Sequence, residues 1–360
     1  MAVASLAPAG SGVTVGVDTH KDVHVAAAFT SDLGRPLGHL QIPTTPAGYR
    51  QLLGWAAGLG HPVRFGIEGT GSFGAGLTRF LRDAGGEVIE VNRPNRQTRR
   101  ARGKSDPVDA EAAARAVLSG EATTIAKQDH DLTGMIRSLR TARRSAVNMR
   151  TQVANQLHAL LITAPAELRE QLRSLPRAHL VERAAGLRPG PVTTPLAAAE
   201  LAWRSLAVRQ RRLDAELAAL DRELERLTRQ AAPRLCERPG VGADVAGALL
   251  VASGDTPERL RSEAAFASLC GVAPLPAASG KITHRHRLNR GGDRLANGAL
   301  WRIVMYRLTS HPPTRAYMAR RQAQGRSKRE VIRCLMRYVA REVYRYLVPP
   351  TADALALDKP

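Results

Sequence analysis

The sequence predicts a mixed α/β domain at the N-terminus, then a long helical segment, then a mainly α-helical C-terminal domain. Strand and helix patterns alternate over the first third of the chain, leucines recur at heptad spacing in the middle, and turns rich in glycine and proline separate apolar helices after Pro233. With 360 residues, 44% of them hydrophobic and 4% aromatic, the chain is long enough for two or three domains with aliphatic cores. The predicted limits are 1–125, 126–232 and 233–347, with a tail over 348–360.

The first three predicted strands form a meander. Over 13–18 valine alternates with threonine and glycine and the run ends on a carboxylate, which is typical of a strand that presents its last side chain to a cleft. Two more strands are predicted over 24–29 and 39–42. The pair Thr45-Pro46 is an N-cap followed by a first-turn proline, and it opens a helix that continues to residue 59.

The chain then alternates between strand and helix. A strand over 63–67 ends on Glu68, a glycine-rich turn leads into a helix over 77–83, and another strand follows over 87–91. A meander of three strands followed by this alternation is the order of a ribonuclease-H-like fold, in which a mixed sheet is flanked by helices.

Residues 130–230 are predicted to be helical, with a proline-rich break between residues 165 and 195. Two apolar stripes follow heptad spacing. Either the two helices fold back on each other around an ordinary intramolecular core, or they form a coiled coil that joins subunits, and the spacing leaves both open. The stripes consist of Leu132, Leu139, Ala146, Val153 and Leu160, and of Leu206, Leu213, Leu217, Leu220, Leu224 and Leu227.

After residue 233 the pattern predicts a domain of several helices. Pro239-Gly240-Val241-Gly242 precedes an apolar helix over 245–252 and looks like a helix-hairpin-helix turn, in which backbone N–H groups at a helix start hold a phosphate. Further helices are predicted over 262–347, around a loop at 274–292. The last residues of the chain are predicted to be frayed.

The charge of the chain is strongly basic after residue 90. Lys and Arg number 53 against 32 Asp and Glu, a net charge of +21, whereas residues 1–90 hold six basic and seven acidic residues. Only six of the 53 are lysine, and arginine offers a planar fork that matches phosphate. This balance excludes an ordinary neutral metabolic enzyme and favours nucleic acid as the partner.

The predicted nucleic-acid contacts lie in two basic stretches and in the glycine turn. The second stretch, 281–345, holds 17 basic residues against three acidic ones, which is too one-sided for an ordinary solvated helix face. The predicted contacts are Arg93, Arg96, Arg99, Arg100, Arg102, Lys104, Gly240, Gly242, Lys281, Arg285, Arg287 and Arg290.

The spacing of the cysteines and the hydropathy of the sequence indicate in which cellular compartment the protein is expected. Cys236, Cys270 and Cys334 lie too far apart in the sequence for a zinc cluster or a disulfide framework, so we expect reduced thiols. The sequence has no run of about 18 apolar residues and no signal-peptide pattern at its start. We therefore expect a cytoplasmic protein that makes no membrane contact.

Four carboxylates are candidates for a metal centre. Asp18 and Glu68 stand at the exits of predicted strands, and Asp106 and Asp109, three residues apart, precede a helix expected over 110–118 and share a face. Without a cation, four converging carboxylates would repel one another by several kcal/mol, and Mg²⁺ is the natural match for oxygen ligands. Two such ions polarise a scissile phosphate and activate the attacking oxygen. The alternative is structural, because Asp106 before a proline is a good N-cap and Asp109 fits a capping box.

Several short motifs together carry a family resemblance. Val15–Lys21, Gly66–Gly71 and Lys104–Ala110 strongly resemble the three acidic motifs of the DEDD-type insertion-sequence transposases, the IS110 family, which are described as bridge-RNA-guided recombinases. Pro239–Gly242, and Cys270–Pro274 with Ala278-Ser279-Gly280, look like the C-terminal transposase domain of that family. The resemblance extends over residues 13–346.

The resemblance implies a RuvC-like N-terminal domain, a helical coiled-coil middle and a C-terminal domain that holds a nucleophilic serine. Asp18, Glu68, Asp106 and Asp109 would then be Mg²⁺ ligands, and Ser279 would attack a DNA phosphate to give a phosphoserine link through which donor and target DNA are joined. It also implies a bridge RNA that selects the target by base pairing. Finally, it implies dimers that pair into a tetramer on DNA, with the active site shared between subunits.

Taken without the resemblance, the residues leave two other functions open. A serine followed by glycine is ordinarily a turn, although the nearby Lys281, His284 and Arg285 would neutralise a phosphate. One alternative is therefore a RuvC-like metal-dependent nuclease or junction resolvase that uses activated water. The other is a non-catalytic nucleic-acid-binding scaffold with decayed acids, and the four intact acids argue against it.

Overall fold

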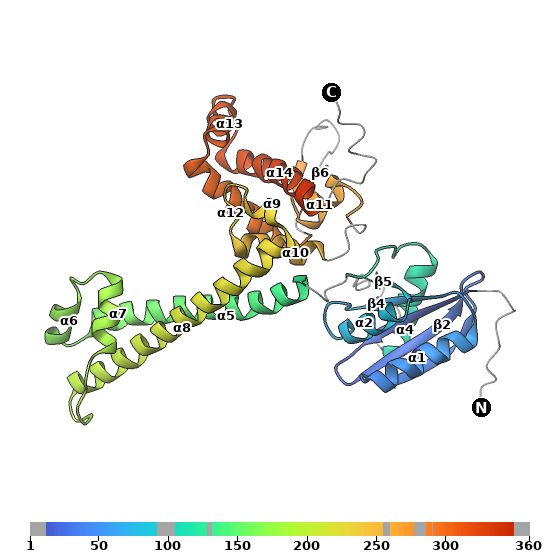
Figure 1. The fold of residues 1–360 in the computed structure, drawn as a ribbon, viewed down its shortest axis with the longest axis horizontal. Coiled ribbons are helices and arrows are strands. Elements are labelled where there is room, and N and C mark those ends of the chain that lie inside the picture. The colour runs from blue at the N-terminus through green and yellow to red at the C-terminus, as the bar shows by residue number, and fades with distance from the viewer. Residues whose placement is uncertain are drawn as a thin grey trace. The chain divides into compact units, whose positions relative to one another are not determined.

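A computed structural model describes the chain in two compact units (Figure 1). One unit comprises Met1–His130 with Gly254–Arg259, and the other comprises Asp131–Ser253 with Leu260–Pro360. The described residues are 12–91, 105–127, 132–254, 260–276, 286–289 and 291–348, without the side chains of Arg177, Arg287 and Leu288.

A five-stranded mixed sheet, in the order β3-β2-β1-β4-β5, forms the first unit. Its first three strands are an antiparallel meander, and β4 and β5 add to the other edge of β1 in parallel. The strands are β1 (Val13–Thr19), β2 (Val23–Thr30), β3 (Pro36–Pro43), β4 (Val63–Glu68) and β5 (Glu87–Val91), and the helices between the later strands are α1 (Pro46–Leu59) and α2 (Ala75–Asp83). The predicted α/β domain, including the capping of α1 by the Thr45 side chain, is confirmed.

Alternation along β1 divides the sheet into two faces. Val13, Val15 and Val17 are fully buried in a core that they share with Leu52 of α1 and Leu77 of α2. The residues between these valines face the opposite side, because successive side chains of a strand point to opposite faces. On that side lies α4 (Asp106–Leu118), whose alanines pack against β2 and β5.

The second unit begins with a helical hairpin. Helices α5 (Leu132–Thr163) and α8 (Pro195–Ala231) run side by side, and two short helices in the proline-rich break, α6 (Ala166–Leu172) and α7 (Arg177–Ala185), were not predicted (Figure 1). Arg143 pairs with Asp221, and Arg150, further along α5, pairs with Asp214, which is earlier in α8. The two helices are therefore antiparallel.

The heptad stripes of the hairpin are covered within this single chain. Ala146 and Val153 of α5 share a core with Leu213 and Leu217 of α8. Of the two alternatives that the spacing left open, the intramolecular core is therefore the one that the structure shows. The stripes no longer argue for pairing between subunits, because their apolar faces are already buried.

Six helices and a two-stranded ribbon make up the rest of the described second unit. They share a hydrophobic core to which α5 contributes Ile136 and α8 contributes Leu224 and Leu227. The elements are α9 (Pro233–Cys236), α10 (Ala243–Ser253), α11 (Glu263–Leu269), α12 (Arg294–Ser310), α13 (Pro312–Ala323), α14 (Lys328–Leu347), β6 (Pro274–Pro276) and β7 (His286–Leu288). The mostly helical C-terminal region is confirmed, and the three domain limits stay a prediction.

Among the described residues, no helix combines the length and the apolar character that a membrane span requires. Cys236, Cys270 and Cys334 are all free thiols, as expected. Cys270, the residue that follows α11, is fully buried, and this burial raises the pKa of its thiol to about 12.

Candidate active site

Two of the predicted carboxylates stand side by side at the end of the sheet. Strands β1 and β4 pair in parallel with Val17 opposite Ile67, so the next residues on the two strands, Asp18 and Glu68, are neighbours. The Thr19 hydroxyl ties the two strand ends together by donating to the Glu68 backbone carbonyl at 2.8 Å. The prediction that Asp18 and Glu68 mark strand exits is therefore correct.

Glycines in β1 and β4 let α4 approach the sheet closely. A Cβ on Gly16 would lie 2.1 Å from the Ala110 carbonyl oxygen and 2.2 Å from the Ala114 nitrogen, so only glycine fits beneath this helix. A Cβ on Gly66 would lie 2.6 Å from the Val117 side chain. The absence of side chains at these two positions is what seats α4 on the strands.

The same alternation directs the carboxylates toward α4. Asp18 and Glu68 each follow one of these glycines by two residues, so their side chains share the face that α4 covers. Asp106 and Asp109 lie in the first turn of α4. Both Asp106 and Asp109 are close enough to Asp18 to raise the pKa of its carboxyl.

A compact set of three side chains forms the centre of this site. His20 Nε2 lies 3.1 Å from Asp18 Oδ2 and 3.3 Å from Asp106 Oδ1, and the three ligand atoms lie within 4.8 Å of one another. Asp18 is 8% exposed, whereas His20 and Asp106 are open to solvent. Among the described residues this set includes neither Glu68 nor Asp109.

Sequence reasoning missed His20. His20 belongs to the first acidic motif, Val15–Lys21, in which only the carboxylate Asp18 is predicted to be a ligand. The available signal was its spacing: a residue two positions after Asp18, at the end of a strand, points to the same side as that carboxylate.

The electrostatics of Asp18 fit a bound cation. Burial raises the pKa of the Asp18 carboxyl most, Asp109 and Asp106 raise it further, and His20 lowers it. Ionised carboxylates crowded in this way are stabilised by a divalent ion with oxygen ligands. The donor set of the described residues therefore fits a divalent metal held by Asp18 and Asp106, with Glu68 and Asp109 beside it.

Asp18→Asn is expected to raise the Tm of the cation-free protein by a few degrees at neutral pH. Because the folded state raises the pKa of Asp18, the folded chain holds this proton to a higher pH than the unfolded chain. The ionised carboxyl therefore costs stability above the folded pKa, and the gain from asparagine disappears in acid. Thermal unfolding at several pH values measures this, and a lower Tm for the variant at pH 7 would contradict it.

The structural alternative for the aspartate pair is not supported at Asp106. Helix α4 begins at Asp106 rather than at residue 110, its N-cap is Ser105, and no side-chain hydrogen bond caps it. The structural alternative in which Asp106 is the N-cap therefore does not hold. Asp109 is 7% exposed, and its backbone N–H donates to the Ser105 carbonyl as an ordinary first-turn helical bond.

Ser279 lies outside the described residues, but both flanks of its loop are described. Strands β6 and β7 pair antiparallel, with Pro276 opposite His286, so residues 277–285 connect the ends of a two-stranded ribbon. Gly271, before the ribbon in the sequence, and Gly292, after it, touch so closely that a Cβ on Gly292 would lie 2.7 Å from the Gly271 nitrogen. Both glycines have positive φ, which only glycine adopts without strain.

Most predicted phosphate contacts also lie outside the described residues. Arg287 is in β7, but its side chain is not described. The contacts beyond the described residues are Arg93, Arg96, Arg99, Arg100, Arg102, Lys104, Lys281, Arg285 and Arg290.

The predicted turn at Pro239–Gly242 is held tightly against α12. Gly240 has φ +82°, and a Cβ there would lie 3.1 Å from the Tyr306 ring and 3.2 Å from the Ile303 carbonyl oxygen. The buried Arg307 donates from Nε to the Pro239 carbonyl at 2.9 Å. Its other two nitrogens donate to the Glu342 carboxylate at 2.6 and 2.9 Å, so the turn leads into α10 from a fixed position.

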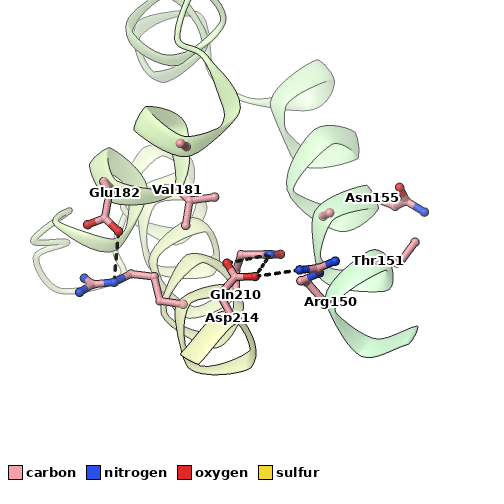
Figure 2. Close-up of a pocket in the computed structure, with 10 residues that line it drawn as sticks. Arg150, Thr151, Asn155, Val181, Glu182, Gln210 and Asp214 are labelled. Carbon is pink, nitrogen blue, oxygen red and sulfur yellow. Dashed lines mark hydrogen bonds and ion pairs between the residues drawn. The ribbon is translucent and has the colours of Figure 1, made fainter. Parts of the chain in front are cut away.

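A separate cavity of about 750 Å³ lies between α5, α7 and α8 (Figure 2). Its charged side chains pair with one another: Arg150 with Asp214 at 3.4 Å and Arg211 with Glu182 at 3.3 Å. It contains none of the residues predicted to be catalytic.

Comparison with known proteins places the carboxylates and the turn in two matched regions. A family model for DEDD transposases of the IS110 type matches residues 15–164, and a model for transposases of the IS116/IS110/IS902 family matches residues 232–319. The 43.6 kDa protein of insertion element IS110 from Streptomyces coelicolor is 32% identical over 151 residues, which is 41% of this chain and 36% of that protein. A Streptomyces coelicolor protein described as a transposase of the IS117 mini-circle is 28% identical over 366 residues, which is 86% of each chain.

Proposed function

The chain belongs to the IS110 family of DEDD-type transposases, and from this membership we propose that it cuts and rejoins donor and target DNA during movement of an insertion sequence. One observation carries the proposal within this structure: carboxylate oxygens of Asp18, at a strand end, and of Asp106, at a helix start, lie 3.1 and 3.3 Å from His20 Nε2. Their positions fall inside the matched transposase region.

We propose a RuvC-like role for the α/β unit. Asp18 and Asp106, supported by Glu68 and Asp109, would hold Mg²⁺ or a similar ion. Such an ion supplies Lewis-acid stabilisation of a phosphate in its pentacovalent transition state. The carboxylates would hold the ion, and Asp18 would do so from a buried position in which its side chain has little freedom to move.

We assign the nucleophile to Ser279. Its oxygen would form a bond to the DNA phosphorus as the bond from phosphorus to one deoxyribose oxygen breaks, the serine losing a proton and the deoxyribose hydroxyl gaining one. Lys281 and Arg285 follow in the same loop and would neutralise the phosphate. Family membership supports this assignment, together with the match of residues 232–319 to a transposase model.

The proposed partners of the chain are nucleic acids. The net charge of +21 supports an extended phosphate backbone as the ligand, and the arginine-rich stretches and the Gly240–Gly242 turn would grip it. A bridge RNA would select donor and target by base pairing.

A covalent protein–DNA link tests the serine mechanism. Full-length protein incubated with donor DNA and a divalent ion is expected to yield an adduct that survives boiling in detergent, and Ser279→Ala is expected to abolish it. Ser268→Ala is the matched control, because Ser268 is exposed on α11 and is outside the proposed machinery.

The same experiment decides between two enzymes. A RuvC-like nuclease with activated water needs only the carboxylates, whose geometry is described, and it would leave free DNA ends with no adduct. Cleavage that persists in Ser279→Ala and is lost in Asp18→Asn would favour that nuclease over the transposase.

We also propose that the active site is shared between subunits in a dimer or tetramer on DNA. Mixing Ser279→Ala protein with Asp18→Ala protein is then expected to restore strand exchange, since each variant supplies the group that the other lacks. If the mixture stays as inactive as either variant alone, the site is not shared.

A further inference from the structure

We propose that His20 is a nitrogen ligand of the cation held by Asp18 and Asp106, and that it makes this centre prefer Mn²⁺ to Mg²⁺. The inference rests on the metal centre of the proposed function and adds its metal preference. It departs from the all-carboxylate Mg²⁺ site that sequence reasoning expected.

The two spacings that involve His20 Nε2 fit one small divalent ion. In an octahedral site with bonds of about 2.1 Å, neighbouring ligand atoms are separated by about 3 Å. His20 Nε2 lies 3.1 Å from the Asp18 oxygen and 3.3 Å from the Asp106 oxygen, so the nitrogen occupies the position of a neighbouring ligand to both carboxylates.

A hydrogen bond accounts for only one of these two contacts. The Nε2 atom of a histidine carries at most one hydrogen, and a single N–H aims well at one acceptor. Here two carboxylate oxygens approach the same nitrogen at nearly the same distance. A cation placed between the three atoms satisfies both oxygens and the nitrogen lone pair together.

His39 provides the contrast. Its Nε2 lies 3.1 Å from one carboxylate oxygen, that of Glu111 on α4, in an ordinary one-to-one contact. The two histidine side chains are about equally exposed, at 43% for His39 and 46% for His20. The difference between them is the second carboxylate at His20.

The local fold explains why His20 reaches this position. Asp18 is the last but one residue of β1 and His20 is the first residue after the strand, and the His20 side chain contacts both Asp18 and Asp106. Asp106 approaches from the start of α4. The imidazole therefore reaches the centre from the same strand end as the buried carboxylate.

The preference for Mn²⁺ follows from the donor set. Carboxylate oxygens suit Mg²⁺ and Mn²⁺ alike, whereas imidazole favours transition metals, and Mg²⁺ gains little from replacing water with nitrogen. One nitrogen ligand beside two carboxylates thus raises the affinity for Mn²⁺ relative to the affinity for Mg²⁺. Substitution by glutamine places an amide oxygen near the former nitrogen and should remove the shift while keeping a hard donor.

Binding of Mn²⁺ to the full-length protein, followed by electron paramagnetic resonance, tests the proposal. Wild-type protein is expected to show ¹⁴N coupling in the spin-echo spectrum of bound Mn²⁺, and His20→Gln is expected to lose it. Competition with Mg²⁺ should show the Mn²⁺ preference falling about tenfold or more in His20→Gln, a loss comparable to that of removing even an outer partner of a metal ligand. His39→Gln should match wild type in both measurements.

Each result has a defined meaning. Retention of the ¹⁴N coupling and of the Mn²⁺ preference in His20→Gln would overturn the ligand role of His20 and leave the proposed function intact. Failure of the wild type to bind Mn²⁺ or Mg²⁺ in the presence of DNA, or binding by Asp18→Asn as tight as that of the wild type, would instead overturn the metal centre. If His20→Gln does not fold, the wild-type spectrum alone decides, since bound Mn²⁺ without ¹⁴N coupling refutes the proposal.

Discussion

Gly16→Ala is expected to destabilise the α/β unit by about 3 kcal/mol or more, the upper end of what overpacking a core costs. The added methyl would lie 2.1 Å from the Ala110 carbonyl oxygen and 2.2 Å from the Ala114 nitrogen. Both obstacles are backbone atoms of α4, so no side-chain rotation relieves them. The helix must lift from β1 or the strand must bend.

The same change is expected to abolish cation binding, because α4 carries Asp106 in its first turn and Asp18 follows Gly16 on the same face of β1. Separating the helix from the strand separates the two carboxylates. Urea unfolding measures the stability, and Mn²⁺ titration at a temperature where the variant stays folded measures the site. Wild-type affinity for Mn²⁺ in folded Gly16→Ala would show that α4 docking does not position the ligands.

Gly54→Ala is the matched control for this prediction. Gly54 lies on the exposed side of α1, and a Cβ there meets nothing within 4 Å. The exchange should therefore stabilise the protein by about 0.5–1 kcal/mol, the usual gain from alanine in a helix interior. A lower unfolding free energy for Gly16→Ala and a higher one for Gly54→Ala would show that the loss comes from the contact with α4 and not from alanine itself.

Most of the α/β unit could be predicted because its signals are local. Alternating valines, the Thr45 cap and the glycine turns each act on neighbouring residues, and the strands and helices form where these patterns stand. The positions of Asp18 and Glu68 at strand ends also followed, because each carboxylate comes at the end of an apolar strand pattern.

The features that were missed depend on contacts that no local pattern encodes. Heptad leucines define an apolar face but do not say which chain covers it, so the spacing could not distinguish the α5–α8 hairpin from a pairing of subunits. The start of α4 was misplaced because Asp106 before Pro107 has the same pattern whether the aspartate caps the helix or begins it. The proximity of His20 to Asp106 arises only when α4 docks on Gly16.

Glu342→Leu is expected to destabilise the C-terminal helices more than Arg307→Met, although the two variants break the same ion pair. The Arg307 side chain is 7% exposed and that of Glu342 is 33% exposed. Removing Glu342 therefore leaves a buried guanidinium whose one remaining hydrogen-bond partner within the described part of the chain is the Pro239 carbonyl, at a cost of about 3–5 kcal/mol. Removing Arg307 leaves a carboxylate that water reaches, so the cost should be about 1–3 kcal/mol, the range for hydrogen bonds to charged groups.

The double variant Arg307→Met/Glu342→Leu separates this reasoning from a general loss of packing. If the penalty of Glu342→Leu comes from the stranded charge, deleting that charge as well should recover part of the stability, so the double variant should be more stable than Glu342→Leu alone. Chemical denaturation of all four proteins measures the cycle. A double variant whose loss equals the sum of the two single losses would contradict the expectation, because then neither side chain depends on the other for its burial.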